Sequence, residues 1–309
     1  MTAIFVSGAL MTTFDQPQQN AAEIEKREAA RADRVEKLVA RICKASPLGK
    51  KIVESAIERG ISIGIDGDKG NCLGCYVPSM KYVSLDEKAP DAKLISTIVH
   101  ECRHSEQKPT HDHSYSVYSN VAEVRALEAD AMAHECAAVY QMRKTEPDTY
   151  AAFCDRHGGM MQAYEASFEK DKDADKAKSE AFKAWYDHAS YVENYDRSVV
   201  DFMEMGKLYS GAYKKEITPK QLSAEFGYVD EAFFASARAN TVSEKTAKNA
   251  AIVERGHIRH ALKLFGRSKI KTSADYFYIR DANGNVEPPK RRQLNPAMAK
   301  ALSNGGSRL

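Results

Sequence analysis

The sequence predicts an α+β fold that is predominantly α-helical, with a small β-sheet or hairpin and an added helical C-terminal region. Two observations predict this fold. Short segments with alternating apolar residues, which are typical of strands, cluster between positions 61 and 85. Almost everything after Pro147 has the composition of helices. A few strands followed by many helices are typical of an α+β protein.

Two helices are expected before the strands. Residues 21–42 are rich in Ala, Glu, Lys and Arg, which favour helix. A second helix is expected over residues 48–59, because Pro47 suits a helix start and Gly60 suits a helix end.

Three strands and two further helices follow in the prediction. The strands are expected at residues 61–66, 74–77 and 82–85, and the helices at residues 91–107 and 115–143. A last strand is expected at residues 276–279. Glycines predict breaks in the C-terminal helical region, near Gly158-Gly159, Gly211, Gly227 and Gly256.

Charge and hydropathy exclude several classes of function. The formal net charge is only +2, so we expect no nucleic-acid partner. No segment approaches the roughly 20 apolar residues of a membrane span, and the apolar N-terminus lacks preceding positive residues. We therefore expect no membrane partner, and a protein that is cytoplasmic or exported without a classical signal peptide. The six scattered cysteines suggest buried thiols in a reducing compartment.

The segment His100-Glu-Cys-Arg-His104 contains candidate metal ligands and a candidate general base. Histidines at positions i and i+4 share one face of a helix, so both imidazoles can reach a single ion. Glu101 lies at the flank of that face, where a carboxylate can take a proton from a metal-activated water. Apolar residues occupy the opposite face: Leu94, Ile95, Ile98, Val99 and Cys102. One face can therefore pack into a core while the other lines a cleft.

A third protein ligand is expected on the next helix. Its apolar residues at helical spacing predict one buried side, and Glu128 lies in the middle of it. A buried carboxylate needs a cation, so Glu128 is the predicted ligand. Glu135 shares this side and is the alternative ligand. An ion pair of Glu128 with Arg125 or Arg103 is the alternative without a metal.

These motifs resemble the gluzincin branch of zinc peptidases. Residues 98–107 (IVHECRHSEQ) and 127–133 (LEADAMA) are similar to bacterial metallopeptidase domains in which an HExRHxxQ helix pairs with an EADA helix. The resemblance covers roughly residues 60–143. It implies a zincin-like core, a bound Zn²⁺ ion, and a strand bordering the cleft, for which residues 82–85 are the candidate. One departure is that Ala126, not glutamate, stands four residues before Asp130.

With this resemblance, four segments are expected. They are an N-terminal extension and helix (1–45), a zincin-like metallopeptidase core (46–145), a helical region (146–270), and a short hairpin with a basic tail (271–309).

The implied reaction is hydrolysis of a peptide bond in a protein or peptide substrate, with Glu101 as the general base. A group that stabilises the oxyanion is also expected. The sequence leaves six candidates for it: Tyr115, Tyr118, Tyr191, Tyr195, His111 and His188.

Two other functions are compatible with the same residues. The chain could be a partner-binding or exported bacterial protein with a structural or degenerate metal site. It could also be a zinc amidase that acts on a non-protein amide, because a Lewis acid and a base serve any amide. The sequence does not fix the oligomeric state. Cys72 and Cys75 have CxxC spacing but no second pair of Cys or His ligands at suitable spacing. His111 and His113 lie in a polar loop, where they could bind a second metal, touch substrate or have no function.

Overall fold

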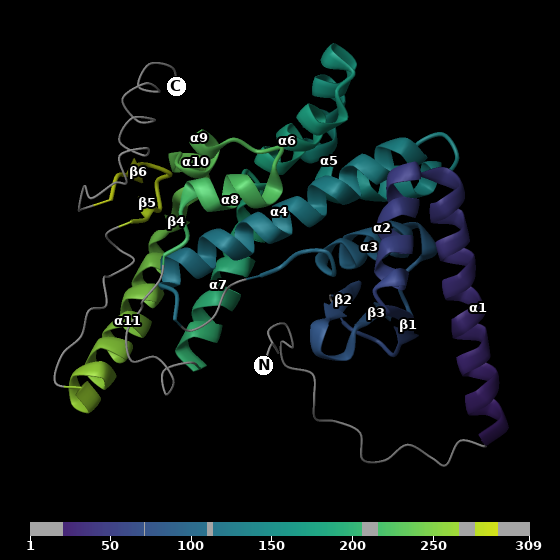
Figure 1. Cartoon of the computed structure of the whole chain (residues 1–309), viewed down its shortest axis with the longest axis horizontal. Helices are drawn as coiled ribbons and strands as arrows, with labels where there is room; N and C mark the ends of the chain where they lie inside the picture. The colour runs from purple at the N-terminus through teal and green to yellow at the C-terminus, as the bar shows by residue number, and fades with distance from the viewer. Residues whose placement is uncertain (1–20, 71, 110–113, 206–215, 266–275, 290–309) are drawn as a thin grey trace. The chain divides into compact units, whose positions relative to one another are not determined.

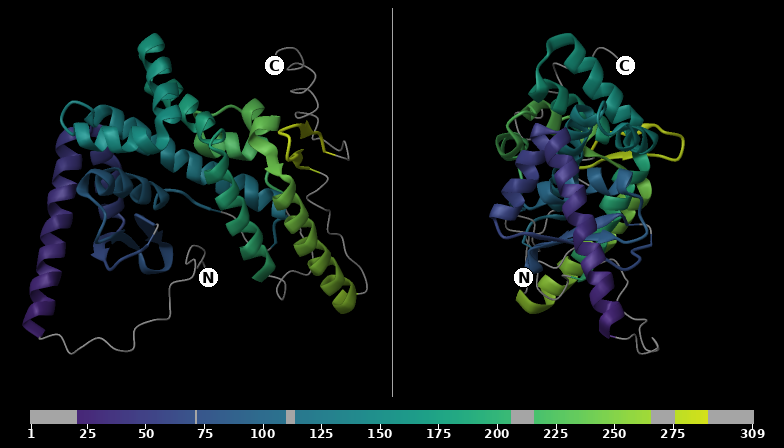
Figure 2. Two further views of the ribbon diagram at one scale, coloured as in Figure 1. Left: turned by 180° about the vertical axis from the view of Figure 1, so that it is seen from behind. Right: turned by 90° about the vertical axis from the view of Figure 1, so that its right-hand side faces the viewer.

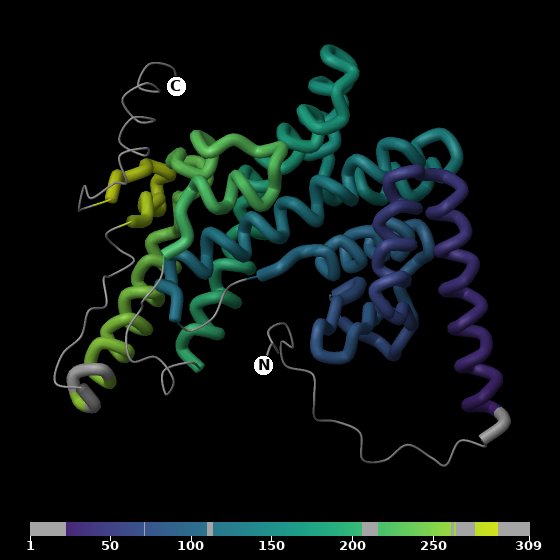
Figure 3. Tube along the Cα trace, in the orientation of Figure 1, coloured from purple at the N-terminus to yellow at the C-terminus, as the bar shows by residue number. Residues whose placement is uncertain are grey.

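The computed structural model describes residues 21–70, 72–109, 114–205, 216–265 and 276–289. Contacts between residues separate two compact units, residues 1–108 with 131–181 and residues 109–130 with 182–309 (Figure 1). The helix α4 (Val117–Met142) belongs to the second unit up to Asp130 and to the first unit from Ala131. It is one continuous helix, as the chain trace shows (Figure 3).

The other helices have the following bounds: α1 Ala21–Ala45, α2 Pro47–Glu58, η1 Pro78–Met80, α3 Asp91–His104, α5 Pro147–Asp171, α6 Ala174–Trp185, α7 Ala189–Met205, α8 Pro219–Phe226, α9 Glu231–Phe234, α10 Ala237–Asn240 and α11 Glu244–Phe265. The strands are β1 Ser62–Asp66, β2 Gly74–Val77, β3 Tyr82–Asp86, β4 Thr241–Ser243, β5 Tyr278–Arg280 and β6 Val286–Glu287. The predicted α+β fold, mostly helical with small sheets, is confirmed.

Local signals explain the helix boundaries that the sequence predicted well. The Ser46 hydroxyl accepts a hydrogen bond from the Gly49 N–H at 2.9 Å, and Pro47 occupies the first turn of α2. Gly60 follows α2 with φ +78°, which is the left-handed region that glycine favours. Both ends of α2 are therefore set by residues at or close to them in sequence.

The first unit contains a three-stranded sheet with the order β1-β3-β2. β3 lies in the centre, pairing in parallel with β1 and antiparallel with β2. The prediction that residues 82–85 border a cleft is therefore wrong, because both edges of β3 are already paired. β2 is the edge strand that packs beside α3. Strand order depends on pairing between distant residues, which alternation along one strand does not encode.

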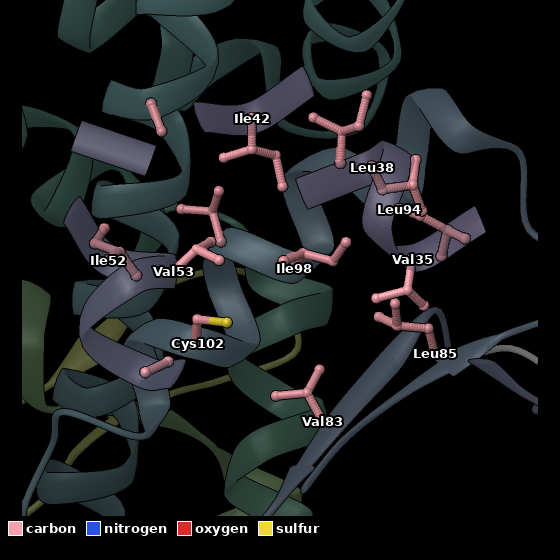
Figure 4. Close-up of a cluster of buried hydrophobic side chains, with 14 of the residues drawn as sticks. Val35, Leu38, Ile42, Ile52, Val53, Val83, Leu85, Leu94, Ile98 and Cys102 are labelled. Carbon is pink, nitrogen blue, oxygen red and sulfur yellow. The ribbon is translucent and has the colours of Figure 1, made fainter. Parts of the chain in front are cut away.

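The core of the first unit lies between the sheet and its helices (Figure 4). The apolar face predicted for α3 is confirmed, since Leu94, Ile98 and Cys102 are fully buried in this core. They meet side chains of α1 and α2 and those of Val83 and Leu85 from β3. This packing fixes the rotation of α3 and so decides which side chains its other face presents.

The helix α4 is buried on nearly all sides, not on a single stripe. Glu123, Asp130 and His134, which do not belong to the predicted apolar side, are exposed by only 1%, 0% and 6%. Helical spacing separates a buried side from an exposed side only in a helix at the surface. A central helix buries every face, so burial alone does not single out Glu128.

The second unit packs the first part of α4 with α7 and α11, which run side by side (Figure 2). Its sheet has the order β4-β5-β6. The predicted strand at residues 276–279 corresponds to β5, whereas β4 was not predicted. A fully buried ion pair joins Arg125 to Asp196 at 2.6 Å.

The predicted helix breaks have mixed outcomes. Gly227 ends α8 with φ +65°, as predicted. Near Gly158 the helix α5 only kinks, at His157. The break at Gly256 is wrong, because α11 continues through it. Gly211 lies outside the described residues.

Other features of the chain bear on its class. None of the helices in the described part combines the length and apolar composition needed to cross a membrane. All six cysteines are free thiols. The four-segment division stays a prediction.

Candidate metal centre

Two histidines of α3 face each other. His100 and His104 are one helical turn apart, and their imidazole rings meet edge to face with centroids 4.7 Å apart. The two Nε2 atoms are separated by 3.0 Å. Nitrogens bound to one tetrahedral zinc ion at about 2.0–2.1 Å lie about 3.3–3.4 Å apart, so the observed spacing is close to that of a metal pair.

A side-chain oxygen lies near the other ring nitrogen of each histidine. The Nδ1 of His100 lies 3.2 Å from Oε2 of Glu135, and the Nδ1 of His104 lies 2.8 Å from Oε1 of Gln107. With a proton on each Nδ1, directed at these oxygens, each Nε2 would present a lone pair. Two such lone pairs 3.0 Å apart would repel, and a cation between them would remove the repulsion.

Glu128 completes a group that could hold a metal ion. One carboxylate oxygen of Glu128 and one ring nitrogen from each of His100 and His104 lie within 4.8 Å of one another. Glu128 is 5% exposed. It lies on α4 two turns before Glu135, which contacts His100, so its place follows from the geometry of one helix. Two imidazoles and a carboxylate are a ligand set that suits Zn²⁺.

Glu135 lies behind His100. Its carboxylate approaches Nδ1, whereas Nε2 of the same ring faces His104. This position favours Glu128 over Glu135 as the third ligand, a choice that the sequence left open. Burial works to raise the pKa of Glu135, but the hydrogen bond and charge of His100, with the charges of His157 and Arg156, lower this pKa to about 2. Glu135 is therefore ionised and suited to orient the His100 ring.

The arginines proposed as alternative partners of Glu128 bind other carboxylates. Arg125 donates to both carboxylate oxygens of Asp196, at 2.7 and 2.6 Å. Arg103 donates to Glu106 at 2.5 Å. For Arg125 these contacts weaken the ion-pair alternative.

Glu101 is held at the edge of the sheet. The backbone N–H of Tyr76 in β2 donates to Oε2 of Glu101 at 2.7 Å, and Glu101 is 8% exposed. A bond from a backbone N–H to a carboxylate is charge-assisted and strong. The sequence did not predict the contact of Tyr76 with Glu101, or the places of Gln107 and Glu135 beside the two histidines. The spacing of Gln107, three residues after His104 on a helix, was the one local signal available.

The structure places two of the remaining predicted residues, Tyr118 and Cys72, in other contacts. His111 and His113 lie outside the described residues. Tyr118 is buried in the second unit, where its hydroxyl donates to Asn240 at 2.8 Å. The Cys72 thiol donates to the carbonyl of Gly74 at 2.8 Å. The oxyanion-stabilising group stays a prediction.

Comparison with known proteins gives one family. Residues 13–208 match the family described as "Putative metallopeptidase family (DUF6782)". Curated proteins gave no match, and solved structures gave none.

Proposed function

Because the chain belongs to this metallopeptidase family, we propose that it is a zinc-dependent peptidase. In this proposal His100, His104 and Glu128 bind the ion, and Glu101 is the general base. The substrate is a protein or peptide. The facing Nε2 atoms of the two histidines are the observation that supports it most strongly, because two imidazole nitrogens 3.0 Å apart have nearly the spacing of two ligands of one ion.

Each residue has a distinct task in the proposed reaction. A bound zinc ion supplies Lewis-acid chemistry, acidifying a water molecule and polarising the scissile carbonyl. Glu101 takes a proton from the attacking water and delivers it to the leaving amine. The Tyr76 N–H holds Oε2 of Glu101, which leaves Oε1 for this proton transfer. Glu135 and Gln107 hold the Nδ1 protons of the two histidines, so that both Nε2 atoms can bind the metal.

The experiment is a hydrolysis assay on a mixed peptide library, with cleavage products identified by mass spectrometry. We expect wild-type protein to cleave peptides, to stop after chelation, and to recover when zinc is added back. Glu101→Gln should retain zinc but not cleave. Glu169→Gln, which alters an exposed carboxylate on α5, is the control and should behave like wild type.

Two outcomes would contradict the proposal. Cleavage that persists in metal-free protein would remove the metal from the reaction. Zinc-loaded protein that cleaves amides of peptidoglycan fragments but no peptide would assign it to amidases of non-protein substrates.

A further inference from the structure

The strand β2 has one free edge. Within the described residues it pairs with β3 alone. The Asp86 N–H donates to the Leu73 carbonyl at 2.9 Å, so the backbone groups of Leu73 point toward β3. Backbone direction alternates along an antiparallel strand. The N–H and C=O groups of Gly74 and Tyr76 therefore point away from β3, toward the free edge.

Glu101 binds this free edge. The Tyr76 N–H that donates to Oε2 at 2.7 Å is one of the outward-pointing groups, so this hydrogen bond replaces none of the hydrogen bonds between β2 and β3. A carboxylate held through one oxygen loses rotational freedom. The backbone of β2 thus fixes the position of the other oxygen.

The position of β2 beside α3 depends on the missing side chain of Gly74. A Cβ atom added there would lie 2.8 Å from Cγ2 of Thr97, 3.1 Å from Cδ2 of Leu85 and 3.2 Å from the backbone oxygen of Ser84. Real Cβ contacts are rarely so short, so β2 or its neighbours would have to shift. Thr97 lies on α3 one turn before Glu101. The close approach of Gly74 to Thr97 and the hydrogen bond from Tyr76 to Glu101 therefore both belong to the contact between β2 and α3.

We propose that Gly74 is a positioning residue for Glu101, because it lets β2 approach α3 closely enough for the Tyr76 N–H to hold the carboxylate. This inference rests on the proposed function, in which Glu101 is the general base. Tyr76 acts through its main chain, so its identity is not what matters at this contact. The steric condition at Gly74 predicts that a single methyl group disturbs the general base without touching a metal ligand.

Four proteins test the proposal: wild type, Gly74→Ala, Gly74→Ala with Thr97→Ser, and Gly67→Ala. Serine at 97 removes Cγ2 but keeps the hydroxyl that donates to the Lys93 carbonyl, so it relieves the shortest contact of the added methyl group. Gly67 is the control, because a Cβ there meets nothing within 4 Å.

The kinetic result should separate positioning from general damage. For Gly74→Ala we expect kcat to fall roughly 10- to 100-fold, since a displacement near 1 Å can cost about 10²-fold. KM and zinc content should stay close to wild type, Thr97→Ser should restore most of the loss, and Gly67→Ala should not differ from wild type. An unchanged kcat in folded Gly74→Ala, or a loss that Thr97→Ser does not restore, would overturn the proposal.

A second measurement does not need activity. The amide proton of Tyr76 in labelled protein should resonate downfield because of its charge-assisted bond. It should move upfield in Glu101→Ala and in Gly74→Ala, and return when Thr97→Ser is added. If wild type proves inactive, the proposed function fails, but these chemical shifts still show whether Gly74 maintains the hydrogen bond between Tyr76 and Glu101. A Tyr76 resonance that is unchanged in both variants would overturn the positioning role.

A different variant covers the case in which Gly74→Ala does not fold. Tyr76→Pro removes the N–H itself, and edge strands tolerate proline where the N–H faces away from the partner strand. Folded Tyr76→Pro with zinc bound should lose kcat to a similar extent. Full activity in this variant would overturn the proposal.

Discussion

Replacing Glu135 by glutamine should weaken zinc binding without abolishing it. Glu135 is fully enclosed on α4, and Oε2 lies 3.2 Å from Nδ1 of His100, on the opposite side of the ring from the facing Nε2 atoms. Glutamine has nearly the same shape and keeps a carbonyl oxygen for the Nδ1 proton, but it loses the negative charge. The histidine then becomes a poorer metal ligand.

The contacts of Glu135 set the direction of this effect. Contact with His100, together with the charges of His157 and Arg156, holds the pKa of Glu135 below its ordinary value despite burial, so a negative charge stands beside the His100 ring. Loss of an outer-shell partner commonly costs 10- to 100-fold in metal affinity, or about 1.4–2.7 kcal/mol. We expect the Kd for zinc to rise within this range.

The assay is competitive zinc titration against a chelator of known affinity. Glu169→Gln, an exposed carboxylate, should leave the Kd unchanged and serves as the control. Two results would refute the reasoning. A Kd within about twofold of wild type would show that Glu135 does not act on His100. A loss as complete as in His104→Ala would make Glu135 a ligand and not an orienting group.

Three further predictions follow from individual contacts. Glu101→Gln should lower kcat by about 10²- to 10⁴-fold while zinc content stays the same, and a smaller loss would argue against Glu101 as the general base. Arg125→Met should lower the free energy of unfolding by roughly 3–5 kcal/mol in urea titrations, because Asp196 is left buried without its cation, and a cost below about 1 kcal/mol would contradict this. In native protein, iodoacetamide should modify Cys72, which is exposed, well before Cys102, whose pKa burial raises to about 12. Equal rates, read by peptide mass spectrometry, would mean that α3 opens readily.

Local patterns along the chain predicted the part of the fold that local forces decide. The spacing of Leu94, Ile98 and Cys102 predicted both the helix α3 and the face that it buries, because helical periodicity is a property of neighbouring residues. The same periodicity predicted that His100 and His104 lie together on the other face, and in the structure their Nε2 atoms are 3.0 Å apart.

Contacts between distant segments could not be predicted in this way. The sheet order β1-β3-β2 places the middle strand in sequence at the edge, so the strand next to Glu101 was assigned wrongly. Along α4 the apolar spacing treated Glu128 and Glu135 alike, because both lie on a helix that is buried all round. Only the position of His100 separates them, with Glu135 behind the ring and Glu128 among the candidate ligands.

The central claim is that His100, His104 and Glu128 bind one metal ion, and metal content tests it most directly. Elemental mass spectrometry on purified protein should find about one zinc ion per chain in wild type, as a tetrahedral site with one open position requires. Zinc should be lost in His104→Ala and strongly reduced in Glu128→Ala, and His188→Ala should keep it. Wild-type protein that holds no zinc after reconstitution, or a Glu128→Ala variant that binds it as tightly as wild type, would contradict the account.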